Sequence, residues 1–124
     1  MTKVRGVRGA ITVRDNSEEE ILVATGEMLR KLAEDNGLNP EEIAGAIFTV
    51  SQDLNAAFPA KAARQMGWDL VPLMCATEIA VPGSMCGVVR VMVLWNTTKS
   101  QAEIKHVYLR DAVKLRPDLS QGEK

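Results

Sequence analysis

The 124-residue sequence predicts an α/β fold in which helices cover a β-sheet. Apolar runs rich in Val and Ile, which are typical of strands, alternate along the chain with segments whose apolar residues recur at helical spacing. Strands that alternate with helices are characteristic of helices packed on a sheet. The length suits one domain with its own core. We expect this domain to span residues 1–119, followed by a polar, mobile tail at residues 120–124.

The first two elements have the clearest local signals. Residues 4–13 alternate apolar with polar side chains, which predicts a strand. Ser17 followed by three glutamates forms a capping box, and apolar residues then recur on one face until Gly37, which predicts a helix over 18–35. The remaining elements are a short helical start at 39–42, strands at 44–51, 70–75 and 88–95, a helix from Pro59 to Gly67, and either a helix or a short strand at 104–109.

Composition excludes several classes of function. The formal net charge is −1, and no segment concentrates Lys and Arg, which disfavours a nucleic-acid or anionic-membrane surface. Aromatic residues make up only 4% of the chain, too few for base-stacking platforms. No run reaches the length of a membrane span and the first residues have no signal-peptide core, so we expect a cytoplasmic protein.

The sequence also contains little that covalent or metal chemistry would need. Cys75, Cys86 and the single His106 do not form a metal-ligand pattern, and we expect no cofactor. Phosphate-cradling glycine loops and activated-nucleophile motifs are absent. An enzyme with this sequence would therefore act by positioning and charge stabilisation.

Arg90 is the most informative residue, because it lies within a Val-rich apolar run, residues 88–95, that predicts a buried strand. Arginine is rarely fully buried unless an anion meets it. Its planar fork of five donors suits a carboxylate or another ligand oxygen. Two partners are therefore open: a nearby carboxylate, with Glu78 as a candidate, or an anionic ligand.

Four further charged residues are candidates for the same site. Arg8 is flanked by glycines that allow a ligand to come close, although it could equally be a water-exposed arginine of an edge strand. Lys61 and Arg64 are three residues apart and share a helix face, either as its solvated side or as a second pair of cations for an acidic ligand. Glu78 directly follows a strand, where loops often carry site residues.

Three uncharged or weakly basic residues carry weaker signals. Tyr108 is the only tyrosine, and a half-buried tyrosine usually has an ordinary hydroxyl partner. His106 is expected to be a surface or packing residue rather than a base. Cys75 fits the behaviour of a small buried apolar residue, and nothing in its surroundings marks it as a reactive thiolate.

Seven short motifs follow one another along nearly the whole chain. They are residues 5–10 (RGVRGA), 58–64 (FPAKAAR), 71–72 (VP), Glu78, 89–91 (VRV), 106–109 (HVYL) and 115–119 (LRPDL). Together they resemble the AroH class of monofunctional chorismate mutases, which rearrange chorismate to prephenate in phenylalanine and tyrosine biosynthesis. The resemblance implies an α/β fold with a mixed sheet covered by helices, in which three subunits build a pseudo-barrel with active sites at their interfaces.

The resemblance also implies a role for each site residue. Arg90 would contact the ether oxygen and a carboxylate of chorismate, Arg8 a carboxylate, and Glu78 the ring hydroxyl. Tyr108 would help to hold the side-chain carboxylate. The other substrate-binding residues would be Phe58, Ala60, Lys61 and Arg64 from the neighbouring subunit, and Leu73, Met74, Cys75, Leu115 and Arg116 around the pocket.

Two other functions fit some of the same residues. Small trimeric α/β proteins that hydrolyse imines or enamines also hold a carboxylate with an arginine at a subunit interface. A non-catalytic sensor of an anionic metabolite would use Arg90 for binding alone.

Overall fold

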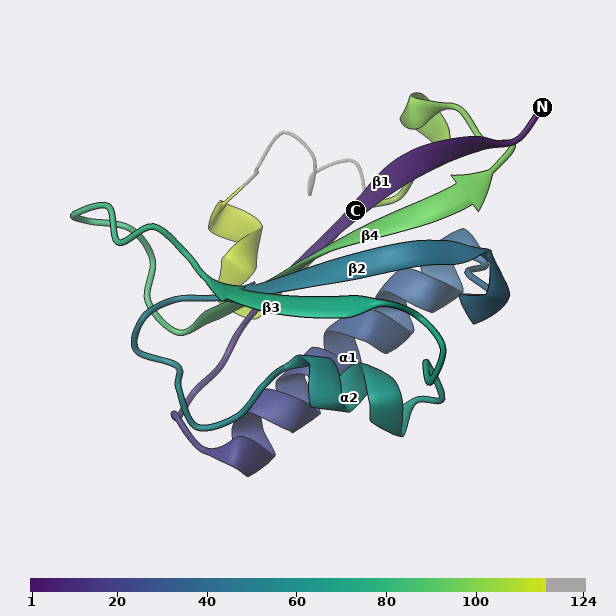
Figure 1. Cartoon of the computed structure of the whole chain (residues 1–124). Coiled ribbons are helices and arrows are strands. Elements are labelled where there is room, and N and C mark those ends of the chain that lie inside the picture. Colours follow the sequence, from purple (N-terminus) through teal and green to yellow (C-terminus); the bar gives the residue numbers. More distant parts are fainter. Residues whose placement is uncertain (116–124) are drawn as a thin grey trace.

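A computed structural model describes residues 1–115, so Arg116 and the tail expected at residues 120–124 lie outside the described part. Within this range, helices α1 and α2 lie together on one face of a five-stranded sheet (Figure 1). None of its helices has both the length and the apolar character needed to cross a membrane. The elements, with η marking a 3₁₀ helix, are β1 (Lys3–Thr12), α1 (Glu18–Asn36), η1 (Pro40–Glu42), β2 (Ile43–Val50), α2 (Ala60–Gln65), β3 (Leu73–Thr77), β4 (Val88–Thr97), η2 (Gln101–Glu103), β5 (Val107–Leu109) and η3 (Arg110–Lys114).

The sheet is mixed, as expected, and its strand order is β3-β2-β4-β1-β5. The central strand β4 runs antiparallel to both β1 and β2. The outer strands add in parallel, β5 to β1 and β3 to β2. The strand that contains Arg90 is therefore the middle one, with two strands on either side.

The helices cover only one face of this sheet, and we call the other the open face. Along β4, Val89, Val91 and Val93 are buried beneath the helices. Arg90 alternates with them and lies on the open face, where 44% of its side chain is exposed. The buried strand expected at residues 88–95 is therefore confirmed as a strand, but it is buried on one face only. Successive side chains of a strand point to opposite faces, and α1 and α2 lie on one face alone.

Three other segments differ in detail from the expectation. The helical start at 39–42 is a single 3₁₀ turn. The strand expected from residue 70 begins at Leu73 and continues to Thr77, because Pro72 has no N–H to donate to a ladder and Leu70 is 93% exposed. The alternatives at 104–109 resolve to a strand, β5, in which three residues pair with β1.

The sequence signals around α1 are confirmed. The Ser17 hydroxyl accepts the Glu20 N–H at the start of the helix, and Gly37 closes its end in the left-handed conformation, with φ +71°. The buried face of α1 packs on β1 at Gly9. A Cβ at Gly9 would lie 3.1 Å from side-chain atoms of Met28, Leu32 and Val91. The glycine that flanks Arg8 therefore serves close helix–sheet packing.

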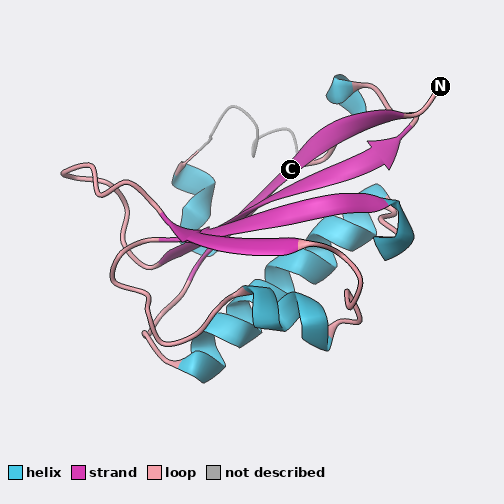
Figure 2. Cartoon of the chain, in the orientation of Figure 1, coloured by secondary structure: helices cyan, strands magenta, loops and turns pink. Residues whose placement is uncertain are grey.

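A second glycine and an aspartate anchor the start of β4, close to Arg90. The Gly87 N–H donates to both carboxylate oxygens of Asp53, at 3.1 and 3.0 Å. Gly87 has φ +63°, and a Cβ there would lie 3.0 Å from the Val13 carbonyl oxygen. This corner ends the long loop between β3 and β4, which projects beyond the sheet (Figure 2). It thereby sets where β4 begins.

We expect the Asp53 corner to make stability depend on pH. The hydrogen bond from the Ser51 hydroxyl is the main cause that lowers the pKa of the Asp53 carboxyl below its ordinary value of 3.8. Burial partly opposes this shift, and the Gly87 N–H adds to it. A carboxyl whose pKa is lowered by folding stabilises the fold above its unfolded pKa, and this contribution is lost as the pH falls through the folded pKa. The wild type should therefore have a larger free energy of unfolding than Asp53→Asn at about pH 5. This difference should be smaller at about pH 3.

Urea unfolding of both proteins across this range measures the difference. Asp69→Asn is the matched control, because Asp69 is exposed. The free energies of unfolding of this variant and of the wild type should differ by the same amount at about pH 3 and at about pH 5. A gap between wild type and Asp53→Asn that stays constant with pH would contradict the prediction.

Candidate active site

One row of side chains crosses all five strands on the open face. The cross-strand partners, taken in order through β3, β2, β4, β1 and β5, are Ala76, Thr49, Arg90, Ala10 and Tyr108. Directly paired residues project from the same face of a sheet. Arg90 therefore lies at the middle of the row, and the small side chain of Ala10 leaves room beside it.

A cavity of about 420 Å³ lies over this row. Arg8 belongs to the next row, directly opposite Met92, and so lies diagonally from Arg90 on the same face. Diagonal neighbours are within reach of long side chains. The residues that line the cavity are Arg8, Gly9, Ala10, Ile47, Thr49, Glu78, Arg90, Val91, Met92 and Tyr108. The fold therefore brings together four residues predicted from the sequence: Arg8, Glu78, Arg90 and Tyr108.

Glu78 is held by two contacts with β2. Its N–H donates to the Val50 carbonyl oxygen at 2.8 Å, and its Oε2 accepts the Thr49 hydroxyl. The same Oε2 lies 3.8 Å from Nε of Arg90, which is longer than a hydrogen bond. Within residues 1–115, Arg90 thus has a local carboxylate nearby but no hydrogen bond that occupies its terminal nitrogens.

Strand β5 and the residue that precedes it, His106, support the other side of the cavity. The Arg8 N–H donates to Nδ1 of His106 at 3.0 Å, so this histidine fixes the backbone of a site residue. Tyr108 is only 6% exposed and packs with Ala10 and Ala112, and Leu115 packs against this group. His106 is partly buried and therefore lies between the surface and packing positions expected from the sequence.

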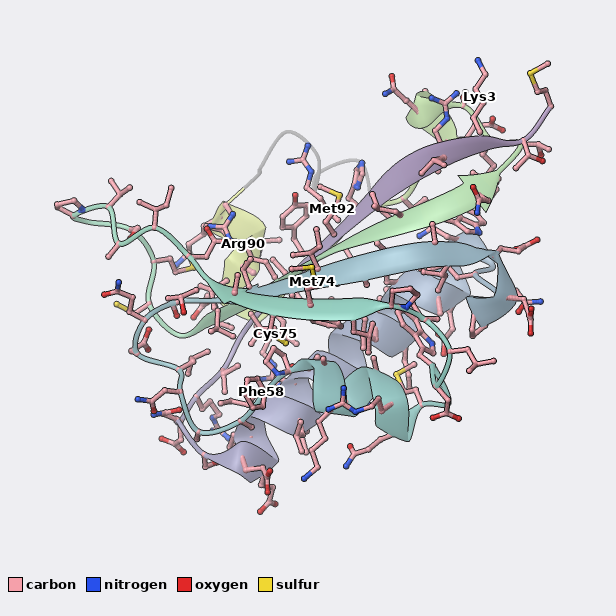
Figure 3. All side chains as sticks on the ribbon, viewed as in Figure 1. Lys3, Phe58, Met74, Cys75, Arg90 and Met92 are labelled. Carbon is pink, nitrogen blue, oxygen red and sulfur yellow. The ribbon has the colours of Figure 1, made fainter. Side chains whose placement is uncertain are left out.

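The predicted cations Lys61 and Arg64 belong to a second cluster, on the other side of β3. Phe58, Lys61, Arg64 and Cys75 line a separate cavity of about 520 Å³. The Lys61 ammonium lies 3.1 Å from Oε2 of Glu18. Figure 3 shows Phe58 and Cys75 on the side of α2, whereas Arg90, Met74 and Met92 lie on the open face. Within one chain the edge strand β3 therefore separates this second cluster from the residues around Arg90.

The other predicted pocket residues have mixed positions. Ala60 is buried in the core, at 4% exposure, and Leu73 packs against the core from its edge. Met74 lies on the open face, 68% exposed, directly opposite Ile47 of β2. Within residues 1–115, no three His, Cys, Asp or Glu side chains form a group that could hold a metal ion.

Comparison with known proteins identifies the family. The family model described as chorismate mutase type I matches residues 4–119. The chain belongs to the chorismate mutase type I family. Chorismate mutase AroH of Thermus thermophilus is 54% identical over 97% of this chain and 99% of its own length. Chorismate mutase AroH of Bacillus subtilis (strain 168) is 45% identical over 94% of this chain and 93% of its own.

Solved structures agree with this assignment. A chorismate mutase from Clostridium thermocellum superposes with a TM-score of 0.86 at 52% identity, covering 87% of this chain and 96% of that one. The resemblance drawn from the seven motifs is therefore confirmed, and with it the predicted isomerase activity of a chorismate mutase type I enzyme.

Thr49 was not predicted from the sequence, although it lines the same cavity as Arg90. The available signal was the same as for Arg90: Thr49 is a polar side chain within the apolar segment Ile47 to Val50. Its partner Glu78 is 29 residues further along the chain. Only the pairing of β2 with β3 and β4 brings these residues together.

Proposed function

We propose that the protein rearranges chorismate to prephenate by binding its compact diaxial conformer and stabilising negative charge on the ether oxygen with Arg90. In this reaction one carbon–oxygen bond breaks while one carbon–carbon bond forms within the same molecule. The reaction needs no nucleophile, and no proton enters or leaves. The catalyst therefore has two tasks, which are to select the conformer and to meet the oxygen as it becomes negative.

The observation that carries this proposal is the state of Arg90. Its guanidinium stands on the open face beside a cavity, with one carboxylate 3.8 Å away. A cation that is already in position stabilises developing charge without reorganisation, and more strongly where water is excluded. Because the fork has several donors, Arg90 can contact both the ether oxygen and a carboxylate.

Arg8, Glu78, Arg90 and Tyr108, which line one cavity, form the first cluster. Its other three residues match the remaining groups of the substrate. Arg8 supplies a second guanidinium for a carboxylate of the dianion. Tyr108, buried at the far end of the row, contributes its hydroxyl to the side-chain carboxylate. Glu78 accepts the hydrogen bond of the ring hydroxyl with the carboxylate oxygen that Thr49 does not occupy.

We further propose that the complete site forms between subunits of a homotrimer. Lys61 and Arg64 lie on the α2 side of β3, whereas Arg8 and Arg90 lie on the open face. One small ligand cannot contact both clusters of a single chain. A neighbouring subunit that places its second cluster over the open face supplies Lys61 and Arg64. Because this contact joins two different surfaces, its repetition closes three subunits into a ring.

The open face has the apolar character that such an interface requires. Its exposed side chains include Val4, Ile47, Met74 and Leu94, which are 55%, 41%, 68% and 36% exposed. Contiguous exposed apolar surface marks interaction sites in soluble proteins. Burial of this face by neighbouring subunits produces the three-subunit pseudo-barrel implied by the resemblance.

The activity is tested by incubating purified protein with chorismate and measuring the loss of its absorbance, with prephenate identified as the product. We expect kcat/KM to change little with pH around neutrality, because no general acid or base takes part. A steep bell-shaped profile centred there would contradict the mechanism, and binding without turnover would contradict the function. Light scattering on the same sample should report three subunits per particle.

A further inference from the structure

On the open face, a threonine hydroxyl contacts the carboxylate that lies nearest Arg90. Thr49 in β2 is paired directly with Arg90 in β4, so both project from the same face. The Thr49 hydroxyl donates to Oε2 of Glu78. That oxygen is the atom of Glu78 that lies 3.8 Å from Nε of Arg90.

The distance of 3.8 Å between Arg90 and Glu78 is longer than that of a direct arginine–carboxylate ion pair. Arginine and a carboxylate prefer two parallel hydrogen bonds, at about 2.7 to 2.9 Å. Burial does not hold the two side chains apart, since 44% of the Arg90 side chain and 35% of the Glu78 side chain are exposed. The Thr49 hydroxyl donates to the Glu78 oxygen nearest Arg90, and that oxygen stays 3.8 Å from Nε of Arg90.

The backbone of Glu78 is held by β2, and Thr49 donates a hydrogen bond to its side chain. The Glu78 N–H is fixed to the carbonyl of Val50, the residue after Thr49 in β2. On the loop side, the neighbouring side chain of Ile79 is 83% exposed, so it does not pack against the carboxylate. Thr49 itself is β-branched and therefore stiff at χ1, which suits a residue that positions another.

We propose that Thr49 is a positioning residue, whose hydroxyl holds Glu78 away from Arg90 so that the terminal nitrogens of Arg90 remain available to the substrate. This inference rests on the proposed function. Without the hydroxyl, Glu78 closes on Arg90 and neutralises part of the charge that the ether oxygen requires. The same movement takes Glu78 away from the ring hydroxyl of the substrate.

The test is Thr49→Val, which replaces the hydroxyl with a methyl group of similar size. We expect kcat to fall about tenfold, the typical effect of losing a hydrogen bond to a charged group, with a smaller change in KM. The effect falls on kcat because the ether oxygen is negative only in the transition state. A crystal structure of the variant should show Glu78 within hydrogen-bond distance of Arg90.

Three further variants separate positioning from a general structural effect. Thr49→Ser keeps the hydroxyl and should recover most of the lost kcat. Thr97→Val makes the same change near the far end of β4, where the hydroxyl accepts the Lys99 N–H, and should have wild-type kinetics. In a Glu78→Ala background, Thr49→Val should cause no additional loss, because the carboxylate to be positioned is gone.

The outcomes are distinguishable. Wild-type kinetics in Thr49→Val, an equal loss in Thr49→Ser, or an undiminished loss in the Glu78→Ala background would each overturn the role of Thr49. Failure of the wild-type protein to convert chorismate would instead overturn the proposed function. Thermal unfolding and light scattering on each variant establish that the compared proteins are folded and equally assembled.

Discussion

Replacing Arg90 with alanine should lower kcat/KM for chorismate by about 10³-fold or more, equivalent to about 4 kcal/mol. The guanidinium stands at the centre of the sheet row, beside the cavity, with its nearest carboxylate 3.8 Å away. It is the one cation of the row, and we expect it to stabilise the charge on the ether oxygen. Most of the loss should appear in kcat, because that charge is absent from the ground state.

Arg90→Lys should also be severely impaired. A lysine is a flexible point charge and lacks the planar fork that contacts two oxygens together. Steady-state kinetics of both variants with chorismate provide the measurement. Arg30→Ala is the matched control, because Arg30 is exposed on α1, on the opposite side of the sheet, and should leave turnover unchanged. Turnover within a few-fold of wild type in either Arg90 variant would refute the mechanism.

Two inactive variants should restore activity when their subunits are mixed. Arg90→Ala removes a cation of the first cluster, and Arg64→Ala removes one of the second cluster. If each site takes one cluster from each of two neighbouring subunits, random mixing at equal amounts leaves about a quarter of the sites intact. Each variant alone should lose most activity. Co-expression or joint refolding, followed by the chorismate assay, measures the recovery.

A second mixture provides the control for this experiment. Arg90 and Glu78 belong to the same cluster of one chain, so mixing Arg90→Ala with Glu78→Ala should restore nothing. Recovery in this control equal to that of the first mixture would argue against sites shared between subunits. The same conclusion would follow if mixed trimers of the first pair formed and remained inactive.

The elements that were predicted correctly are those whose signals are local. Ser17, the glutamates after it and Gly37 lie within or next to α1, and their capping geometry needs no distant partner. The alternation along β1 and the Val-rich run of β4 likewise reflect side chains whose spacing can be read from consecutive residues. The start of β3 was placed too early, because its limit depends on Pro72 and on where β2 offers a partner.

The candidate site was only partly predictable from the sequence. Arg90 and Arg8 were recognisable as charges within apolar or glycine-flanked strands, and Glu78 as a carboxylate after a strand. Their grouping followed from the family resemblance, whereas Thr49 had no motif to mark it. Its proposed role depends on the Glu78 oxygen that lies 3.8 Å from Nε of Arg90.

By itself, the sequence determined the helix caps, the strand periodicity, the presence of arginines where a core residue is expected, and the family. These properties depend on residue type and short spacing. The tertiary structure decided which face of β4 carries Arg90, because that depends on where the helices pack. It also decided that β3 separates the two cationic clusters, and that Thr49 contacts Glu78 and pairs with Arg90. Strand order and register bring residues far apart in the chain into contact, and no local pattern encodes those pairings.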